Sequence, residues 1–378
     1  MKKICYITTL GTTIDSFFIP QINYLAENGF DVTVICSPDI PNLKDKFRDD
    51  VRYITLNIPR GISFLGMLQA IKGFKRIFRE EQFDLIQYST PNAALCAAYA
   101  GKRCGIKLRN YHLMGFRYLG ASGFLRKMLK GIEKWTCSLS TSIECVSKSN
   151  LEMGIAEKIF PGDKASVVWN GSSGGVDLIA FDYSKRAEYR KKIRIIYSLS
   201  DDEFVFGFVG RITKDKGINE LLRAYSNLKN CKLLLVGNIE NGEDLDQQII
   251  ADSKSNPNVI YTGYIQPSKV QMYYCALDCL LLPSYREGFG NAIIEAAAMG
   301  TPAIVSNIPG PIDAIEDGVT AYTVEPRNAV DLQKKMEQIL NSDYKQIGYA
   351  AHEYVATHFD SVMLCKKILE RKRMLLGN

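Results

Sequence analysis

The chain has 378 residues, 46% of them hydrophobic and 23% charged, with a formal net charge of +6. This composition excludes a disordered or fibrous protein, and the length suits two domains better than a single hydrophobic core. The apolar runs are shorter than the roughly 18 residues that a membrane-spanning helix needs.

The first 170 residues alternate short apolar runs with longer amphipathic segments, beginning with a predicted buried strand at 3–9 and not a secretory signal. Segment 16–29 has the pattern of an amphipathic helix that Gly29 ends. Helices between short apolar strands predict parallel strands with right-handed crossovers, and therefore a doubly wound sheet. The predicted strands are 3–9, 31–37, 51–58, 84–90, 108–114, 141–147 and 165–170.

A glycine- and serine-rich, then charged, segment at 170–192 interrupts this alternation and predicts a flexible linker. We therefore expect an α/β protein of two doubly wound, Rossmann-like domains, 1–172 and 173–360, with a helix at about 361–378 packing back on the first. Such sheets bind ligands beyond the carboxyl ends of their strands, so we expect the chemistry in the cleft between the domains. The second domain contains a clear helix at 217–230 and predicted strands at 204–212, 231–238, 259–265, 278–284, 302–306 and 320–325.

The positive charge is concentrated in the first half of the chain. Residues 1–170 hold 23 Lys and Arg against 15 Asp and Glu, whereas the remainder holds 24 against 26. Segments 72–81 and 126–134 mix basic and apolar residues at helical spacing. Solvated helix faces are the commoner outcome of such patterns, and a surface for anionic lipid headgroups is the alternative.

The stretch SYREGFGNAIIEAAAMGTPAIVS (284–306) places Glu287 and Glu295 around a glycine-bearing turn after an apolar run. Glycines allow a sharp turn, and an acidic residue early in a helix interacts favourably with the helix dipole. An ordinary turn between a strand and a helix therefore explains much of this stretch. In the alternative, backbone N–H groups of the turn bind an anion or sugar hydroxyls. Glu295 would then accept both hydroxyls of a ribose, and Glu287 would accept hydroxyls of the group beyond it.

A second element, FVGRITKDKG (208–217), places Arg211 and Lys216 between a predicted strand and a predicted helix. An arginine fork and a lysine point charge at a strand's carboxyl end suit a diphosphate. Taken alone, Arg211 could equally lie in a solvated loop. The order of the two elements in one domain favours a nucleotide site.

These two segments resemble the signature of the retaining glycosyltransferases of family 4, which have the GT-B fold. EGFGNAIIE is similar to the family's two-glutamate motif, GRITKDKG to its basic pair, and VVWNGSSGGVD (167–177) to the element that ends its first domain. The resemblance is dense in the second domain and loose in the first. It suggests an enzyme like those that build capsular, O-antigen or other lipid-linked glycans in bacteria.

By matched position, the resemblance implies that Arg211 and Lys216 hold the donor diphosphate, Glu295 the ribose and Glu287 the transferred sugar. The backbone beside the sugar would come from Gly288, Phe289, Gly290 and Asn291.

Two residues of the first half also match the family pattern. His112 matches the histidine that faces the donor sugar across the cleft, although a core or surface histidine remains the alternative. Gly11 matches a glycine that lets a phosphate or the acceptor approach, but the expected glycine pair is reduced to one. The implied catalytic set is Glu287, His112, Arg211 and Lys216.

The same resemblance implies a nucleotide-sugar donor, UDP-linked in most such enzymes, and a glycan acceptor carried on a lipid diphosphate. We expect neither a cofactor nor a metal, because Asp244 and Asp246 have the pattern of a helix start and not of a metal-binding Asp-x-Asp. The ten cysteines form no CxxC pair or Cys/His cluster, which indicates buried thiols in a cytoplasmic protein. We expect no nucleic-acid partner.

Two other functions stay open, a GT-B-like nucleotide-sugar epimerase and a non-catalytic nucleotide or glycan binder. A dinucleotide-dependent oxidoreductase is disfavoured, since no GxGxxG follows the first strand. Gly237, Tyr264 and Ile265 could contact a nucleobase, but an ordinary strand end explains them equally well.

Overall fold

The computed structural model describes residues 1–240 and 242–377, and its chain divides into two compact units. The first unit comprises Met1–Gly174 together with the segment that begins at Ser361, and the second comprises Gly175–Asp360. The units are separated after Gly174 and not after residue 172, because Gly174 packs against the backbone of Phe17 whereas Val176 bonds to Phe359 and bridges to Asp360.

Within the described residues, the first unit is built on a parallel sheet of seven strands in the order β3-β2-β1-β4-β5-β6-β7. Its strands are β1 (Lys3–Leu10), β2 (Asp31–Ser37), β3 (Arg52–Thr55), β4 (Leu85–Tyr88), β5 (Leu108–Leu113), β6 (Ser142–Cys145) and β7 (Ala165–Val167). Its helices are α1 (Gly11–Phe17), α2 (Ile19–Glu27), α3 (Phe64–Glu81), α4 (Pro91–Arg103), α5 (Gly123–Leu139), α6 (Lys148–Ala156) and α14 (Ser361–Leu376).

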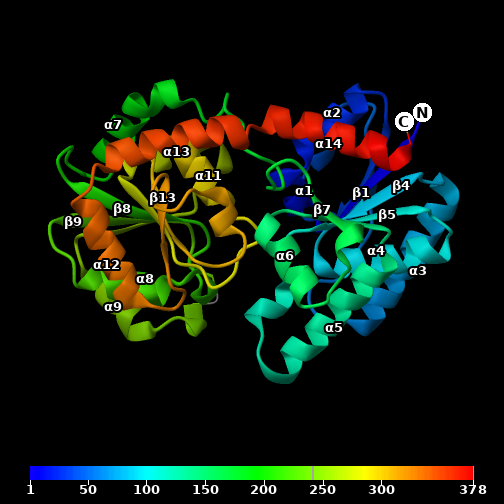
Figure 1. Ribbon diagram of the computed structural model, residues 1–378, viewed down its shortest axis with the longest axis horizontal. Coiled ribbons are helices and arrows are strands. Elements are labelled where there is room, and N and C mark those ends of the chain that lie inside the picture. The colour runs from blue at the N-terminus through cyan, green and yellow to red at the C-terminus, as the bar shows by residue number, and fades with distance from the viewer. Residues whose placement is uncertain (241, 378) are drawn as a thin grey trace. The chain divides into compact units, whose positions relative to one another are not determined.

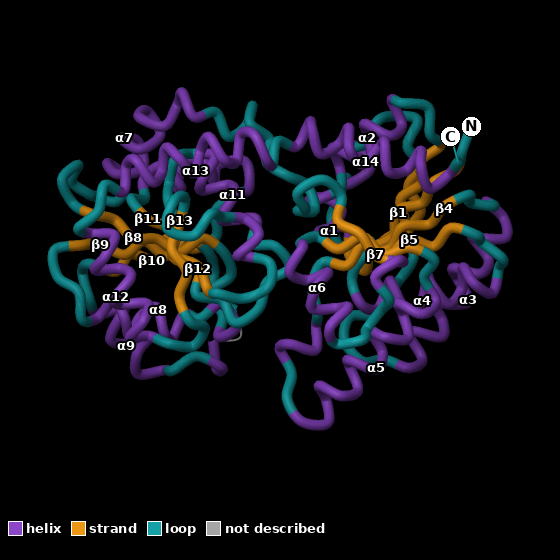
Figure 2. Tube along the Cα trace, viewed as in Figure 1, coloured by secondary structure: helices purple, strands orange, loops and turns teal. Residues whose placement is uncertain are grey.

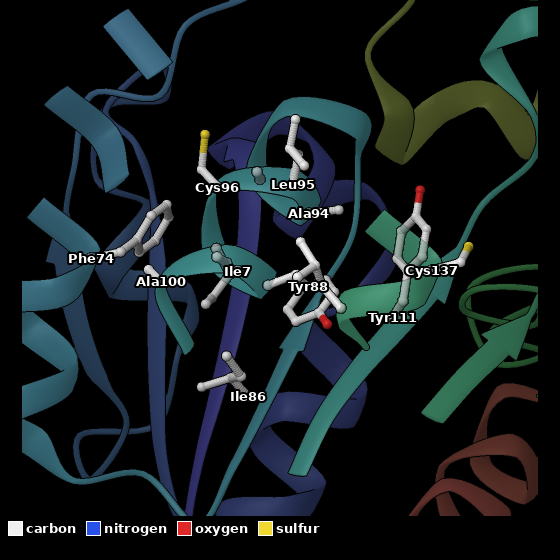
Figure 3. Close-up of a cluster of buried hydrophobic side chains, with 14 of the residues drawn as sticks. Ile7, Phe74, Ile86, Tyr88, Ala94, Leu95, Cys96, Ala100, Tyr111 and Cys137 are labelled. Atoms are coloured by element: carbon white, nitrogen blue, oxygen red, sulfur yellow. The ribbon is translucent and has the colours of Figure 1, made fainter. Parts of the chain in front are cut away.

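Two hydrophobic layers hold the helices of the first unit on opposite faces of this sheet (Figure 1). On one face, α3, α4 and α5 pack over the central strands, and Figure 3 shows Phe74 of α3 beside Ala100 of α4. On the other face, α14 lies against α2, and Leu364, Ile368 and Leu369 are almost fully buried. Burial of each such side chain contributes about 1.5–3 kcal/mol, so α14 is firmly part of the first unit.

The second unit, over its described residues, has a parallel sheet of six strands in the order β10-β9-β8-β11-β12-β13, with helices on both faces (Figure 2). Its strands are β8 (Phe204–Val209), β9 (Cys231–Val236), β10 (Val259–Gly263), β11 (Cys279–Leu282), β12 (Ala303–Ser306) and β13 (Ala321–Val324). Its helices are α7 (Arg186–Ile196), α8 (Ile218–Ser226), α9 (Gln247–Ser255), α10 (Val270–Ala276), α11 (Asn291–Ala298), α12 (Ala329–Leu340) and α13 (Tyr344–His358). The prediction of two doubly wound parallel sheets is confirmed.

Two local predictions are wrong. The segment 170–192 is only partly a linker, because α7 begins at Arg186; its Arg190 and Arg194 both bond to Asp278, at 2.7 and 2.6 Å. The predicted helix at 16–29 is interrupted at Phe18, so that its first two residues end α1 and its continuation is α2. Because α1 begins directly at Gly11, no loop separates it from β1.

Among the described helices, none combines the length and the apolar character that crossing a bilayer requires.

Candidate functional site

The strand order of the second sheet brings the two predicted motifs to neighbouring strand ends. The chain runs outward from β8 through β9 to β10 and then returns to place β11 on the other side of β8. The carboxyl ends of β8 and β11 therefore form the switch point, where doubly wound sheets bind ligands. Arg211 and Lys216 follow β8, and Glu287 follows β11.

At this switch point, Lys216 and Glu287 are in direct contact. The Lys216 Nζ lies 2.5 Å from Oε1 of Glu287, and the Ser284 hydroxyl donates to the same oxygen at 2.8 Å. The side chains of the lysine and glutamate are 19% and 12% exposed. The structure thus brings together one residue from each motif, in a partly buried position where charges are poorly screened.

Close backbone packing fixes the two loops against each other. Gly217 has a left-handed φ of +71°, and a Cβ there would lie 2.0 Å from the carbonyl oxygen of Pro283. The Tyr285 N–H donates to the Asp215 carbonyl at 2.8 Å, and Arg286 pairs with the Asp215 carboxylate at 3.1 Å. The lysine that ends the 3-10 turn 214–216 is therefore held at a set position relative to the glutamate turn.

The Asp215 carboxylate is stabilised in its ionised form. Desolvation raises its pKa, but the Thr213 hydroxyl bond, at 2.6 Å, and the nearby charges of Arg286 and Lys216 hold the pKa below its ordinary value. Asp215 stays negative and anchors Arg286 beside the turn. The sequence reasoning missed this role, although Asp215 lies inside the quoted basic motif.

Arg211 is placed differently from Lys216. Its guanidinium pairs with Glu240 at 3.1 Å, and these side chains are 57% and 47% exposed. An exposed pair of this kind contributes only about 0–1 kcal/mol, so a phosphate could displace Glu240 at little cost. The two predicted diphosphate ligands both follow β8, but each has its own carboxylate partner.

The glutamate turn leads into α11, whose N-cap residue Gly290 has a left-handed φ of +94°. Asn291 is the first residue of the helix, and Gly288 is packed closely by Gly310, where a Cβ would lie 2.7 Å from the Gly288 carbonyl oxygen. The Phe289 side chain is buried against Phe359, with ring centroids 5.2 Å apart. Phe289 can therefore offer a ligand only its backbone.

Glu295 lies one turn into α11, with its side chain partly buried. The hydroxyl of Tyr274, on α10, donates to its Oε2 at 2.8 Å. Burial raises the pKa of Glu295 to about 7, and the bond from Tyr274 lowers it in part. Oε1 is a further acceptor for a ligand hydroxyl. No sequence spacing points to Tyr274 as the partner.

Gly11 begins α1 directly after β1, and its role toward a phosphate or the acceptor stays a prediction. Its N–H donates to Asp39 at 2.5 Å, and the N–H and hydroxyl of Thr12 donate to the same carboxylate. A Cβ at Gly11 would lie 2.8 Å from the side chain of Leu43 and 3.0 Å from Asp39. Both backbone N–H groups at this helix start are therefore bonded to the Asp39 carboxylate.

His112 is the penultimate residue of β5 and is only 7% exposed. Its ring packs edge-on against Phe18 at 5.3 Å, and Nε2 lies 3.3 Å from the Ser173 hydroxyl oxygen. Burial lowers its pKa to about 4, with the charge of Glu144 opposing this and that of Lys372 adding to it. The imidazole is therefore neutral at physiological pH. Its role toward a donor sugar stays a prediction.

The Asp-x-Asp at 244–246 has the predicted helix-start role. Asp246 is the N-cap of α9, accepts from the Ile249 N–H at 3.3 Å and pairs with Arg223 at 2.8 Å. Among residues 1–240 and 242–377, no group of three or more His, Cys, Asp or Glu side chains is arranged to hold a metal ion. Tyr264, one of the weaker nucleobase candidates, is 67% exposed after β10.

Comparison with known proteins matches both halves of the chain to glycosyltransferase families. The family described as Glycosyltransferase Family 4 matches residues 21–172, and that described as Glycosyl transferases group 1 matches residues 189–354. The capsular polysaccharide biosynthesis glycosyltransferase CapM of Staphylococcus aureus is 28% identical over 97% of this chain and 96% of its own.

Two further proteins extend the comparison. The UDP-Gal:alpha-D-GlcNAc-diphosphoundecaprenol alpha-1,3-galactosyltransferase of Escherichia coli is 24% identical, over 81% of this chain and 79% of its own. The structure of HepE of Anabaena in complex with UDP-glucose superposes with a TM-score of 0.76 at 19% identity, covering 99% of this chain and all of that one. The structural likeness shows the GT-B fold.

Proposed function

This chain belongs to the glycosyltransferases of family 4 and has the GT-B fold, and from that premise we propose that it transfers a hexose or N-acetylhexosamine from a UDP-sugar to a hydroxyl of a glycan acceptor. The proposed acceptor is linked to a lipid diphosphate, and the proposed pathway is the synthesis of capsule, O-antigen or a related surface glycan. The names of the CapM and galactosyltransferase relatives, and the UDP-glucose bound to HepE, support this choice.

The contact between Lys216 and Glu287 carries the proposal. It joins a cation from the β8 loop to a carboxylate from the β11 loop, at the switch point of the sheet. A nucleotide-sugar presents a diphosphate and, one bond away, sugar hydroxyls. A lysine and a carboxylate 2.5 Å apart match that junction, since one binds the phosphate and the other accepts from the hydroxyls.

In the proposed reaction, the bond from the anomeric carbon to the diphosphate oxygen breaks, and a bond from the acceptor oxygen forms on the same face with retention of configuration. The acceptor hydroxyl proton passes to the departing phosphate oxygen, so UDP leaves with the bond's electron pair. Arg211 and Lys216 stabilise the charge that develops on the diphosphate, which is the type of interaction that contributes most to such rate accelerations. Glu287 positions the sugar and is not a covalent nucleophile.

The reaction proposed here uses neither a cofactor nor a metal ion. Lys216 and the nearby Arg211 supply positive charge where a divalent ion would otherwise neutralise the diphosphate. Asp246 is committed to capping α9 and to Arg223.

We propose that the protein works at the cytoplasmic face of the membrane, contacting anionic lipid through the first unit. Phe64 and Leu65, at the start of α3, are 75% and 74% exposed, and Phe124, at the start of α5, is 82% exposed. Basic residues follow on both helices: Lys72, Lys75, Arg76, Arg126, Lys127, Lys130 and Lys134. Exposed aromatic and aliphatic tips beside cations are typical of interfacial membrane binding.

Vesicle sedimentation tests the membrane part. Binding to vesicles of anionic phospholipid at low salt, absent with neutral phospholipid, is expected, and Phe124→Ser should weaken it several-fold. Ile179→Ser, which removes an 85% exposed side chain from the second unit, is the matched control. Equal binding of both vesicle types, or of both variants and the wild type, would remove this part of the proposal.

Thermal stabilisation by UDP, GDP, ADP and NADH at equal concentrations tests the donor class. A ligand at about 100 times its dissociation constant adds roughly 2.7 kcal/mol to the stability of the state it binds. We expect stabilisation by UDP, lost in Glu295→Ala and retained in Glu353→Ala, which removes an exposed glutamate of α13. Stabilisation by NADH, or by no nucleotide, would refute the proposed donor site.

A panel of UDP-sugars with a lipid-diphosphate glycan then separates transfer from its alternatives. Release of UDP that depends on the acceptor supports the transferase. Conversion of the UDP-sugar into its epimer without an acceptor would support the epimerase, and UDP binding with no turnover of any donor would support a non-catalytic binder.

A further inference from the structure

Helix α14 brings a fully buried lysine to the first sheet. Lys372 is 0% exposed, and its Nζ donates to both carboxylate oxygens of Glu144 on β6, at 2.8 and 3.0 Å. Arg371 lies 3.5 Å from the same carboxylate and donates to Ser142 at 3.3 Å. Two residues far apart in the sequence therefore form a dry, bidentate ion pair.

Such a pair is a weak source of stability. Removing two charges from water costs several kcal/mol each, and apolar side chains of similar volume often stabilise a core as well or better. The three apolar contacts of α14 already hold this helix on α2. The stability of the fold therefore does not explain why this ion pair is present, and its position in the sheet has to be considered.

Glu144 is the direct neighbour of His112 in the sheet. The two residues are Cα partners in the parallel pairing of β5 with β6. Partners on adjacent parallel strands lie about 4.8 Å apart, and their side chains point to the same face. That face also carries Phe18, against which the His112 ring packs, and α14, which supplies Lys372.

The charges around His112 come from two elements, β6 and α14. Glu144 on β6 favours the protonated ring, and Lys372 on α14 opposes it. Arg371 contacts Glu144, while Tyr6 of β1 is an uncharged neighbour of that carboxylate. Burial, the first cause of the low pKa of His112, acts in the same direction as Lys372. Without the lysine, only Arg371, 3.5 Å from the carboxylate, would oppose the charge of Glu144 beside the imidazole.

We infer that Lys372 and Glu144 are positioning residues that act through His112. By neutralising Glu144, the lysine keeps the imidazole uncharged, so that its Nε2 stays against the Ser173 hydroxyl and does not turn toward the carboxylate. The inference rests on the proposed role of His112 in sugar transfer. It assigns to the last turns of α14 a part in setting the proton state of that site.

The test is a titration of the three histidine rings by NMR, with the His112 signals assigned from a His112→Gln variant. In Lys372→Met, the His112–Glu144 pair should take up a proton, raising the apparent pKa of His112 by about one unit or more. Lys372→Gln keeps a hydrogen-bond donor without the charge and should do the same, in case the methionine variant does not fold. Lys366→Met, on the exposed side of α14, should leave the titration unchanged.

The double variant Glu144→Gln/Lys372→Met separates charge from packing. Lys372→Met alone should lower kcat about tenfold and leave KM for the donor unchanged. The double variant should return the His112 titration to that of the wild type and restore kcat to within about threefold of the wild-type value. An unchanged His112 titration in both lysine variants would overturn the inference. So would a double variant as impaired as the single one. Because the titration needs no turnover, it decides the coupling even if the proposed transfer reaction is refuted.

Discussion

Replacing Glu295 with glutamine should make the second unit more stable while abolishing UDP binding. The glutamine keeps the shape of the side chain and an acceptor for the Tyr274 hydroxyl, but it cannot ionise. It also offers a ribose one neutral acceptor oxygen in place of a carboxylate. The two effects have opposite signs, so a merely disruptive mutation cannot imitate them.

The magnitude follows from the pKa of Glu295, which burial raises from 4.5 to about 7. A carboxyl with a raised pKa binds its proton more tightly in the folded state, so it lowers stability progressively as the pH rises from about 4.5 to about 7. A difference of about 2.5 between the pKa in the folded and unfolded states corresponds to a loss of roughly 3 kcal/mol of stability at pH 8, which the glutamine variant avoids. At pH 5, ionisation of Glu295 lowers the stability by less than about 1 kcal/mol.

Differential scanning calorimetry at pH 5 and pH 8 measures the effect. For a unit of this size, about 3 kcal/mol raises the midpoint temperature by roughly 6–12 °C at pH 8, with a much smaller rise at pH 5. Glu353→Gln, at an exposed position, should show no such pH dependence. A Glu295→Gln variant with equal stability gains at both pH values, or with UDP stabilisation intact, would refute the reasoning.

Three further predictions concern the packing and charges of the second unit. Gly217→Ala should abolish thermal stabilisation by UDP, because its methyl group would lie 2.0 Å from a backbone carbonyl oxygen. Gly318→Ala, at a similar φ of +79° but with open space around it, should lower the free energy of unfolding by only about 1 kcal/mol and leave UDP stabilisation intact. Loss of UDP stabilisation in both variants, or in neither, would contradict the steric argument. Asp278→Asn should lower the free energy of unfolding by about 3–5 kcal/mol in urea titrations, because it leaves the buried Arg194 and the partly buried Arg190 without their carboxylate partner. Asp246→Asn, which breaks an exposed ion pair, should lower it by at most about 1 kcal/mol. Glu240→Gln removes the carboxylate that pairs with Arg211, so UDP binding, measured by calorimetric titration at low salt, should become up to about tenfold tighter. Salt screens exposed charges, so an equal gain in 1 M salt would contradict this electrostatic cause.

The fold was predictable because its signal is local. Short apolar runs such as 31–37 and 231–238, separated by amphipathic segments, are sufficient to indicate buried parallel strands. The motifs at the switch point were predictable for the same reason, since each lies within a few residues of a strand end. Their meeting at Lys216 and Glu287 required only that β8 and β11 be neighbours.

Several contacts were not predictable because their partners lie far apart in the sequence. The charged segment after 185 has the composition of a linker, but two of its arginines bond to Asp278, more than 80 positions away, and so fix it as a helix of the second unit. Asp39 closes the N-terminus of α1 at Gly11, and Tyr274 reaches Glu295 from another helix. None of these pairings has a periodicity or spacing that a single sequence can display.

The return of α14 to the first unit has a consequence for synthesis on the ribosome. Leu364, Ile368 and Lys372 are made after all of Gly175–Asp360, so the first sheet must wait for the second unit before its outer layer and the partner of Glu144 arrive. During that interval α2 exposes an apolar face and Glu144 has no countercharge. A nascent chain stalled before residue 361 should therefore be a strong substrate for chaperones, although most of its first unit has already been translated.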